Sequence, residues 1–248
     1  MKPDFDTDEG IGRRASLGVL VLAEDATVEP ELARITALEG VALYHSRIPM
    51  AAEVRPDTLA RMERELPDAV RLLPAAADLE VVAYACTSGA TMLGSEAVSR
   101  AIGAVLPRAR VTDPLAAILA AGRALEVRRL GLLTPYLPAI SERLRGALEQ
   151  AGFEIVAFGS FEESDDRIVA RITPTSILRA AEQVAQAAAC EALVISCTGL
   201  RCLDILEELE RRIGIPAISS NQALGWQMLR LSGIRDLLPG FGRLLSHH

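Results

Sequence analysis

The sequence predicts an α/β protein built from two similar four-stranded, parallel, doubly wound domains related by pseudo-two-fold symmetry, with a cleft between them. Three observations lead to this prediction. Short runs rich in Val, Ile and Leu alternate with longer amphipathic stretches, as in β-α-β units whose sheet is buried on both faces. The apolar runs form two sets of four in matching order. The chain has 248 residues, half of them hydrophobic, which is enough to bury a large core.

The expected strands are the short apolar runs, and the expected helices are the amphipathic stretches between them. We place strands near residues 17–23, 41–45, 80–85 and 110–112, and then near 129–134, 154–158, 192–196 and 216–219. Helical periodicity covers residues 56–73, 95–106, 115–125, 140–152, 176–189 and 203–214. Several of these stretches begin at Ser or Pro and end at Gly, which is typical of capped helices.

An internal duplication explains why the two sets match. "LGVLVLAED" corresponds to "LGLLTPYLP" at an offset of 113, and Cys86 corresponds to Cys197 at an offset of 111. A third correspondence, at an offset of 108, pairs Asp113 with Asn221. We therefore expect an N-terminal half over residues 1–115 and a C-terminal half over 116–227. A last helix within 228–248 is expected to pack back on one of the halves.

Composition excludes several classes of protein. The net charge is −7, from 33 acidic and 26 basic residues, and the arginines are scattered, so we expect no nucleic-acid partner. The N-terminus "MKPDFDTDEG" has no apolar segment, and the longest apolar runs are far shorter than the roughly 20 residues of a membrane span. A cytoplasmic protein without membrane contact is predicted.

The cysteines and histidines are too few and wrongly spaced for a structural metal site. The four cysteines, at positions 86, 190, 197 and 202, include no C-x-x-C pair, and there are three histidines. We expect free thiols and no metal. Cys190, in an Ala-rich helix end, and Cys202 are interpreted as structural residues, and His45 as a hydrogen-bonded strand-end residue.

The chemistry is expected at Cys86 and Cys197, which follow equivalent strands. In a parallel sheet, ligands bind at the carboxyl ends of the strands, where the next helix offers free N–H groups and a partial positive charge that lowers a thiol pKa. "CTSG" and "CTG" supply hydroxyl and backbone donors for a carboxylate, from Thr87, Ser88, Thr198 and Gly199. A lone strand-end cysteine is usually a packing residue, but two at duplicated positions favour a function.

Two facing thiols fit several reactions. One thiolate can remove a proton beside a carboxylate while the other thiol protonates the opposite face, as in a racemase or epimerase without a cofactor. Covalent addition to an activated double bond would give a cis-trans isomerase. A single thiol donor is enough for a decarboxylase. The alternative outside enzymes is a small-molecule binding accessory protein that retains the cleft without turnover.

Two loops are expected to complete the site. "AEDATVEPE" follows the first strand and offers Asp25 and Thr27 as polar contacts and Val28 as an apolar wall, although helix capping explains the same residues. "LLTPYLP" is the matching loop, in which Tyr136 could bond a substrate carboxylate or cover the core. The acidic run "FEESDDR" is interpreted as a solvated loop.

The chain resembles the Asp/Glu racemase superfamily, in the branch of maleate cis-trans isomerases, arylmalonate decarboxylases and ectoine-utilisation proteins, and within that branch it looks most similar to the ectoine-utilisation proteins. The most specific pieces are "YACTSGATMLG", "LLTPYLP", "DDRIVARI" and "SCTGLRCLDILEELERRIGIPAISSNQA". The resemblance implies two similar α/β domains, a cleft and no cofactor. It also implies that Cys86 and Cys197 are the catalytic pair and that Tyr136 is the tyrosine of the isomerases. Members of the family are often homo-oligomers, and nothing in the surface pattern fixes the number of subunits.

Two differences within the branch bear on the substrate. Arylmalonate decarboxylases look different at Cys86, where they have glycine. Maleate isomerases resemble "SSNTT" where this chain has "AEDAT", so Asp25 replaces an asparagine that binds a carboxylate. An acid there repels a dicarboxylate by on the order of several kcal/mol in a partly desolvated cleft. The expected substrate is therefore a small carboxylate with a cationic nitrogen, an amino acid or an ectoine-like zwitterion, in preference to maleate.

Overall fold

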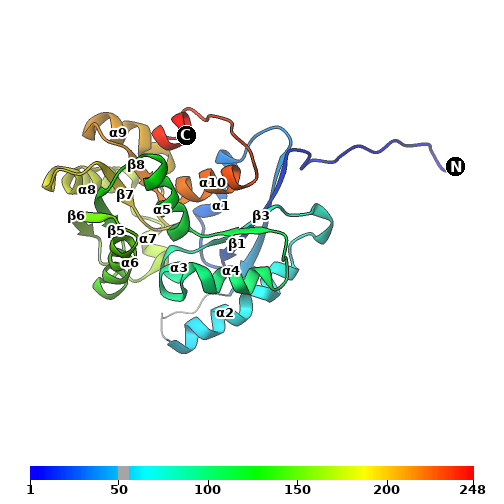
Figure 1. The fold of residues 1–248 in the computed structure, drawn as a ribbon, viewed down its shortest axis with the longest axis horizontal. Coiled ribbons are helices and arrows are strands. Elements are labelled where there is room, and N and C mark those ends of the chain that lie inside the picture. Colours follow the sequence, from blue (N-terminus) through cyan, green and yellow to red (C-terminus); the bar gives the residue numbers. More distant parts are fainter. Residues whose placement is uncertain (50–55) are drawn as a thin grey trace.

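The computed structural model contains two four-stranded parallel sheets flanked by helices (Figure 1), and it describes residues 1–49 and 56–248, with side chains of 56–63 left aside. The first sheet has the strand order β2-β1-β3-β4, and the second has the order β6-β5-β7-β8. Every strand pair is parallel. The predicted α/β class with two matching sheets is therefore confirmed.

The first sheet is built around β1, which pairs with β2 on one side and β3 on the other. All side chains of β3 are buried, as expected for a central strand covered on both faces. The elements of this half are β1 (Ala15–Leu22), α1 (Val28–Ile35), β2 (Val41–Ile48), α2 (Pro56–Arg71), the 3₁₀ turn η1 (Ala75–Ala77), β3 (Val81–Ala85), α3 (Thr87–Leu93), α4 (Ser95–Gly103), β4 (Arg110–Thr112) and α5 (Pro114–Ala124).

The second sheet repeats this plan around β5, which pairs with β6 and β7. β7 is again completely buried. Its elements are β5 (Arg129–Thr134), α6 (Pro138–Gln150), β6 (Glu154–Ser160), α7 (Asp166–Val169), α8 (Pro174–Ala187), β7 (Ala192–Ile195), the 3₁₀ turn η2 (Leu203–Ile205), α9 (Leu206–Ile213), β8 (Ala217–Ser219), α10 (Ser220–Leu231) and α11 (Arg243–His247).

Strand register corrects one of the predicted correspondences between the halves. Ala83 pairs with Thr112 at the end of the first sheet, and Val194 pairs with Ile218 in the second. The next residues along the chain after Thr112 and Ile218, Asp113 and Ser219, both cap the following helix by accepting a backbone N–H. Asp113 is therefore equivalent to Ser219. Asn221 lies two residues after Ser219, so Asp113 and Asn221 are near equivalent strand ends as predicted, but the offset is 106 instead of 108, because a polar residue near a strand end does not fix the register within two positions.

α10 belongs by sequence to the second half but packs on the first. It contacts α1, α5 and β3 as well as its own strand β8 (Figure 1). The approach to α1 is close at Gly225, where an added Cβ would lie 2.8 Å from Ile35 Cγ2. Among the described residues, α10 and not a helix over 228–248 makes these contacts with the first half. The division of the chain at residue 115 remains a proposal, and it falls inside α5.

The predicted helix over 228–248 is corrected. α10 ends at Leu231, and Gly233 then adopts a left-handed backbone with φ of 84°, which ends the helix. The only later α-helix among the described residues is the short α11, after Pro239 and Gly240. Turn-forming residues override the apolar pattern here because they fix the backbone locally.

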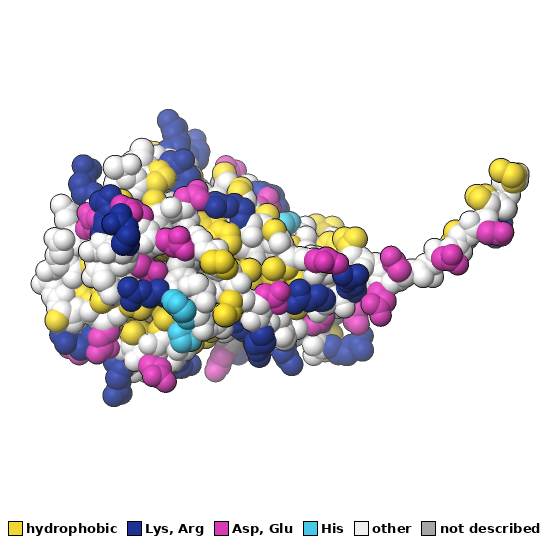
Figure 2. All heavy atoms as spheres, turned by 90° about the horizontal axis from the view of Figure 1, so that it is seen from above, with side chains coloured by type: hydrophobic (Ala, Val, Ile, Leu, Met, Phe, Trp, Pro, Cys, Tyr) yellow, Lys and Arg dark blue, Asp and Glu magenta, His cyan; other side chains and the backbone are white. Residues whose placement is uncertain are grey.

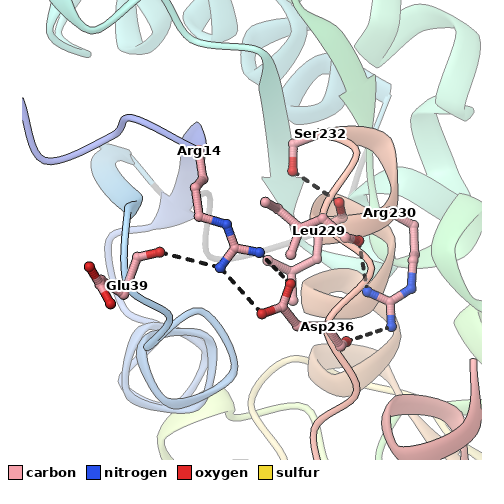
Figure 3. A network of polar contacts seen from close by, with 7 residues as sticks. Arg14, Glu39, Leu229, Arg230, Ser232 and Asp236 are labelled. Atoms are coloured by element: carbon pink, nitrogen blue, oxygen red, sulfur yellow. Dashed lines mark hydrogen bonds and ion pairs between the residues drawn. The ribbon is translucent and has the colours of Figure 1, made fainter. Parts of the chain in front are cut away.

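The segment after α10 is tied to the start of β1 by polar contacts (Figure 3). Arg14 donates to the Asp236 carboxylate, with one contact of 3.2 Å, and Arg230 donates to the Asp236 carbonyl at 3.1 Å. Figure 2 shows acidic and basic side chains interspersed over one face of the molecule, with the N-terminal residues extending away from it. Among the described residues, no helix is long and apolar enough to cross a membrane.

Candidate active site

Cys86 directly follows β3 and is the N-cap residue of α3. Its side chain is 4% exposed, and its Sγ accepts a hydrogen bond from the Gly89 backbone N–H at 3.2 Å. The Ser88 hydroxyl lies 3.5 Å from the same sulfur. A small residue is required at Gly89, because a Cβ there would lie 3.0 Å from the sulfur. The sequence "CTSG" thus forms a cap in which the thiol replaces the usual hydroxyl or carboxylate.

Cys197 lies two residues after β7 and is followed by a turn at residues 198 and 199. Its side chain is 6% exposed, and its Sγ accepts from the Gly199 N–H at 3.3 Å. No helix begins at this cysteine; the predicted helical stretch over 203–214 contains η2 and α9. η2 starts at Leu203, and before it the Gly199 carbonyl accepts from Thr27 of the first half and the Thr198 carbonyl accepts from Asn221 of α10.

Both sulfurs line one cavity of about 30 Å³ between the two sheets. This volume holds about two water molecules. The cavity is lined by Leu22, Glu24, Asp25, Ala26, Cys86, Thr87, Ser88, Tyr136, Asp166, Ala170, Cys197, Thr198 and Gly199. The structure therefore brings together eight of the ten residues that the sequence singled out.

Burial dominates the acidity of both thiols. Desolvation raises the pKa of Cys86, although the Ser88 hydroxyl and the Gly89 N–H act in the opposite direction. Desolvation also raises the pKa of Cys197 to about 12, against hydrogen bonds from Tyr136 and the Gly199 N–H. The expected lowering of the thiol pKa is thus wrong for both. One or two donors to the sulfur do not offset its removal from water.

Tyr136 comes from the β5–α6 loop and is 8% exposed. Its hydroxyl lies close to Cys197 and to Thr87 of the other half, and both affect its pKa, which burial raises well above the usual value. Its carbonyl accepts hydrogen bonds from the Ser160 hydroxyl at 2.6 Å and from the Ser141 hydroxyl at 3.2 Å. These contacts fix the backbone that carries the ring, so the phenol is held rigidly between the two thiol-bearing loops.

The loop after β1 divides between the cavity and the core. Asp25 lines the cavity and also accepts from the N–H groups of Thr27 and Val28, at 2.8 and 2.9 Å. Asp25 therefore accepts from the N–H groups at the start of α1 and also lines the cavity. Thr27 and Val28 do not line the cavity. The Thr27 hydroxyl donates to the Gly199 carbonyl at 3.0 Å, and Val28 is completely buried in the core.

Sequence reasoning missed two acidic residues of the cavity, Glu24 and Asp166. Asp166 belongs to "FEESDDR", which was interpreted as solvated, but it begins α7 and is half-buried. Desolvation raises its pKa, and the neighbouring charges of Asp25 and Asp165 raise it further. The available signal was the resemblance of the "DDR" segment to the family, which points to a position near the site.

The remaining candidates lie outside the cavity. His45 is exposed on β2, and neither Cys190 nor Cys202 is a lining residue. Cys202 is completely buried near Glu31. Across the part of the chain that the structure describes, no group of three or more His, Cys, Asp or Glu side chains is arranged to hold a metal ion.

Comparison with known proteins gives consistent matches. The family model described as arylmalonate decarboxylase matches residues 70–245. A maleate isomerase from Nocardia farcinica is 30% identical over 240 residues, covering 92% of this chain and 94% of the relative. An arylmalonate decarboxylase from Bordetella bronchiseptica is 33% identical over 132 residues, covering 52% of this chain and 55% of the relative.

Solved structures of relatives share this fold, and one of them contains a covalent cysteine intermediate. The Nocardia farcinica maleate cis-trans isomerase, in a variant with a covalently bound succinylcysteine intermediate, superposes with a TM-score of 0.84 at 28% identity, covering 94% of this chain and 99% of that one. A liganded variant of arylmalonate decarboxylase also gives 0.84, at 26% identity, covering 94% of this chain and all of that one. The chain belongs to the arylmalonate decarboxylase and maleate isomerase family, with an Asp/Glu racemase-like fold.

Proposed function

We propose that this protein is a cofactor-independent isomerase or racemase that uses Cys86 and Cys197 on a small substrate with one carboxylate and one cationic group. The supporting observation is the composition of the cavity. Two thiols share it with three carboxylates, those of Glu24, Asp25 and Asp166. Among the described residues that line it, none is Lys, Arg or His.

The charge of the cavity selects between substrate classes. The pKa of Asp166 is raised, by desolvation and then by the Asp25 charge, so these carboxylates already repel each other. A cationic nitrogen would relieve this repulsion, whereas a second substrate carboxylate would add to it. An amino acid or an ectoine-like amidinium carboxylate fits this field better than maleate. The hydroxyls of Ser88, Thr198 and Tyr136 are the donors available for the single substrate carboxylate.

Buried thiols suit proton transfer at a weakly acidic carbon. One cysteine, as the thiolate, takes the proton from the carbon beside the carboxylate and leaves a carbanion. The other cysteine, as the thiol, donates its proton to the opposite face, so the two residues exchange protonation states and no group is consumed. A raised thiol pKa makes the thiolate rarer but a stronger base, which is the property needed for such a carbon.

The comparisons favour a second candidate, cis-trans isomerisation by covalent addition. The relative with the succinylcysteine intermediate is a maleate isomerase. In such a reaction a thiolate adds to the activated double bond, the resulting single bond rotates, and the thiolate leaves to give the trans isomer. Arylmalonate decarboxylation, which needs one thiol as proton donor, is the third candidate because of the family model. The acidic cavity opposes both dianionic substrates.

One incubation separates these reactions. The protein is mixed in deuterated water with amino acids, ectoine derivatives, maleate and an aryl malonate, and the products are followed by NMR. Deuterium at the α-carbon without carbon dioxide release is the expected result. Rearrangement of maleate without deuterium, or carbon dioxide from the malonate, would replace it with the second or third candidate. A ligand that raises the melting temperature but is never converted would indicate a binding protein.

The charge argument has its own test. Asp25→Asn retains an oxygen that can accept from the α1 N–H groups but removes the charge, so we expect it to weaken the preference for zwitterions over dicarboxylates. Glu142→Gln removes an equal charge from the exposed face of α6 and is the matched control. An unchanged preference in Asp25→Asn would show that the cavity charge does not select the substrate.

A further inference from the structure

Tyr84 is a completely buried residue that the cavity does not use. It is the fourth residue of β3, its side chain is 0% exposed, and it does not line the cavity. Within the described part of the chain its hydroxyl oxygen has no hydrogen-bond partner. Leaving a buried hydroxyl unpaired is energetically unfavourable. A phenylalanine would fill the same space without this cost, so the hydroxyl calls for an explanation.

The hydroxyl lies next to the Cys86 sulfur. Residues two apart on a strand project from the same face, which places Tyr84 and Cys86 side by side. The position of a Cβ on Gly89 would be 2.2 Å from the Tyr84 hydroxyl and 3.0 Å from the sulfur, so both atoms face the same space beneath α3. Because the sulfur also borders the cavity, Tyr84 approaches it from the core side, opposite the substrate.

We propose that Tyr84 is a positioning residue whose hydroxyl holds and stabilises the Cys86 thiolate from the core side. In the resting protein the thiol is protonated and the hydroxyl waits without a partner. When Cys86 loses its proton, the sulfur becomes a strong acceptor and the hydroxyl donates to it, in addition to the Gly89 N–H that already donates at 3.2 Å. The proposal deepens the proposed function, since it rests on Cys86 being a reactive thiol.

The electrostatic surroundings agree with this role. Burial raises the pKa of the Cys86 thiol, and the Tyr84 hydroxyl is among the groups that lower it. The charge of Asp166 in α7 acts in the opposite direction on Cys86. Burial raises the pKa of Tyr84 well above its usual value, and the Cys86 and Asp113 charges raise it further. Tyr84 therefore remains a protonated donor wherever Cys86 can ionise.

The other half has no counterpart of this hydroxyl. Ile195 occupies the equivalent place, two residues before Cys197, and fills it with an aliphatic side chain. The phenol of that half comes from Tyr136, which lines the cavity. Each thiol thus has one tyrosine, but only the Tyr84 hydroxyl is shielded from substrate. Its effect must therefore be transmitted through the sulfur.

The test measures thiol reactivity without a substrate. Tyr84→Phe and the parent protein are treated with iodoacetamide at a series of pH values, and peptide mass spectrometry separates Cys86 from Cys197. We expect Cys86 alkylation to fall about tenfold at pH 8, the size expected for losing one hydrogen bond to an ionised sulfur. Its pH profile should move upward while that of Cys197 stays. The melting temperature should be unchanged or higher, because no hydrogen bond is lost in the resting state.

Tyr44→Phe on β2 is the matched control and should alter neither thiol. An unchanged Cys86 profile in Tyr84→Phe would overturn the proposal, as would equal losses at both thiols with a lower melting temperature. If Tyr84→Phe does not fold, 3-fluorotyrosine at position 84 strengthens the donor with little change in shape. Cys86 alkylation should then shift to lower pH, and no shift would again overturn the proposal. Because no substrate is used, a failure of the substrate assignment leaves this result intact.

Discussion

The two halves hold their thiols in different ways. Cys86 caps a helix that begins at the next residue, so its sulfur is held by local capping, while Thr87 beside it bonds Ser220 of α10 at 3.0 Å. The Cys197 loop is braced by the start of α1 in the opposite half and by α10, which packs on that half. The Thr27 hydroxyl donates to the Gly199 carbonyl, and Asn221 donates to both the Thr198 carbonyl, at 2.9 Å, and the Glu31 carboxylate, at 2.8 Å.

Cys86 and Cys197 occupy equivalent positions in the two halves, but the contacts around them differ. Glu31 of α1 is buried and also accepts from the Leu203 N–H at 2.9 Å, so a single carboxylate joins α1 to the turn that follows Cys197. The first thiol depends on local capping, whereas the second depends on contact between the halves. Changes made at matching positions should therefore give unequal results, and four experiments measure how unequal they are.

The largest effect is expected at the thiols themselves. Cys86→Ser and Cys197→Ser should each lower kcat by about 10²–10⁴-fold on the substrate found in the deuterium experiment, because each removes one proton-transfer group. Steady-state kinetics of both variants measures this, with Cys190→Ser as the control outside the cavity. Full activity in Cys86→Ser, together with lost activity in Cys197→Ser, would mean that only the Cys197 thiol takes part in the reaction, as in a decarboxylase.

A pair of glycine substitutions compares the space around each sulfur. A Cβ on Gly89 would lie 2.2 Å from the Tyr84 hydroxyl, whereas a Cβ on Gly199 would meet nothing closer than Val169 Cγ1 at 3.4 Å. Gly89→Ala should lower the free energy of unfolding by about 1–3 kcal/mol. Gly199→Ala should change it by no more than about 0.5 kcal/mol. Urea denaturation checks both, and equal losses would contradict the described difference in packing.

Glu31 tests the brace between the halves. Glu31→Gln retains one oxygen acceptor but places its NH₂ group opposite one of the two donors, the Leu203 N–H or the Asn221 amide. We expect the free energy of unfolding to fall by about 1–2 kcal/mol, because a buried donor is left unpaired. The rate of Cys197 alkylation should change, and that of Cys86 should not. Glu210→Gln is the matched control, since Glu210 accepts from the Ala217 N–H at 2.9 Å entirely within the C-terminal half. If both variants affect Cys197 equally, the brace does not position it.

The smallest effect is an alkaline loss of stability. The folded-state pKa values of Cys86 and Cys197 are raised, the latter to about 12, so the folded protein retains thiol protons that the unfolded chain releases near pH 8.5. Stability from these groups is fully present below that pH and falls as pH rises, by about 0.4 kcal/mol per thiol at pH 8.5. Denaturation of the parent and Cys197→Ser between pH 7 and 9 measures it, and identical slopes would contradict the burial of Cys197.

Much of the architecture could be predicted from the sequence because buried strands and duplication leave local signals. The runs around Leu17, Val81, Leu130 and Ala192 became β1, β3, β5 and β7. The cavity followed from the two cysteines, since carboxyl ends of parallel strands share an edge. Asp166 was missed because its acidic neighbours look solvated in sequence. The contacts that hold the Cys197 loop could not be predicted because they come from residues distant in the chain, Thr27 and Asn221.

The direction in which the thiol pKa values shift could not be predicted from the sequence either. It depends on how completely the cavity excludes water, and that follows from packing between the halves. Likewise Tyr84 looked like one more residue of a buried strand. Its meaning depends on where a single oxygen lies relative to Cys86 and Gly89.

The position of α10 on the opposite sheet limits how this chain can be recombined. A crossover between relatives in the β4–β5 region would join one parent's first sheet to another parent's α10, whose Gly225 must accept Ile35. Chimeras should therefore fold only when α10 is inherited together with α1 and α5. We therefore expect the two halves to be exchangeable between relatives only together, although the architecture is duplicated.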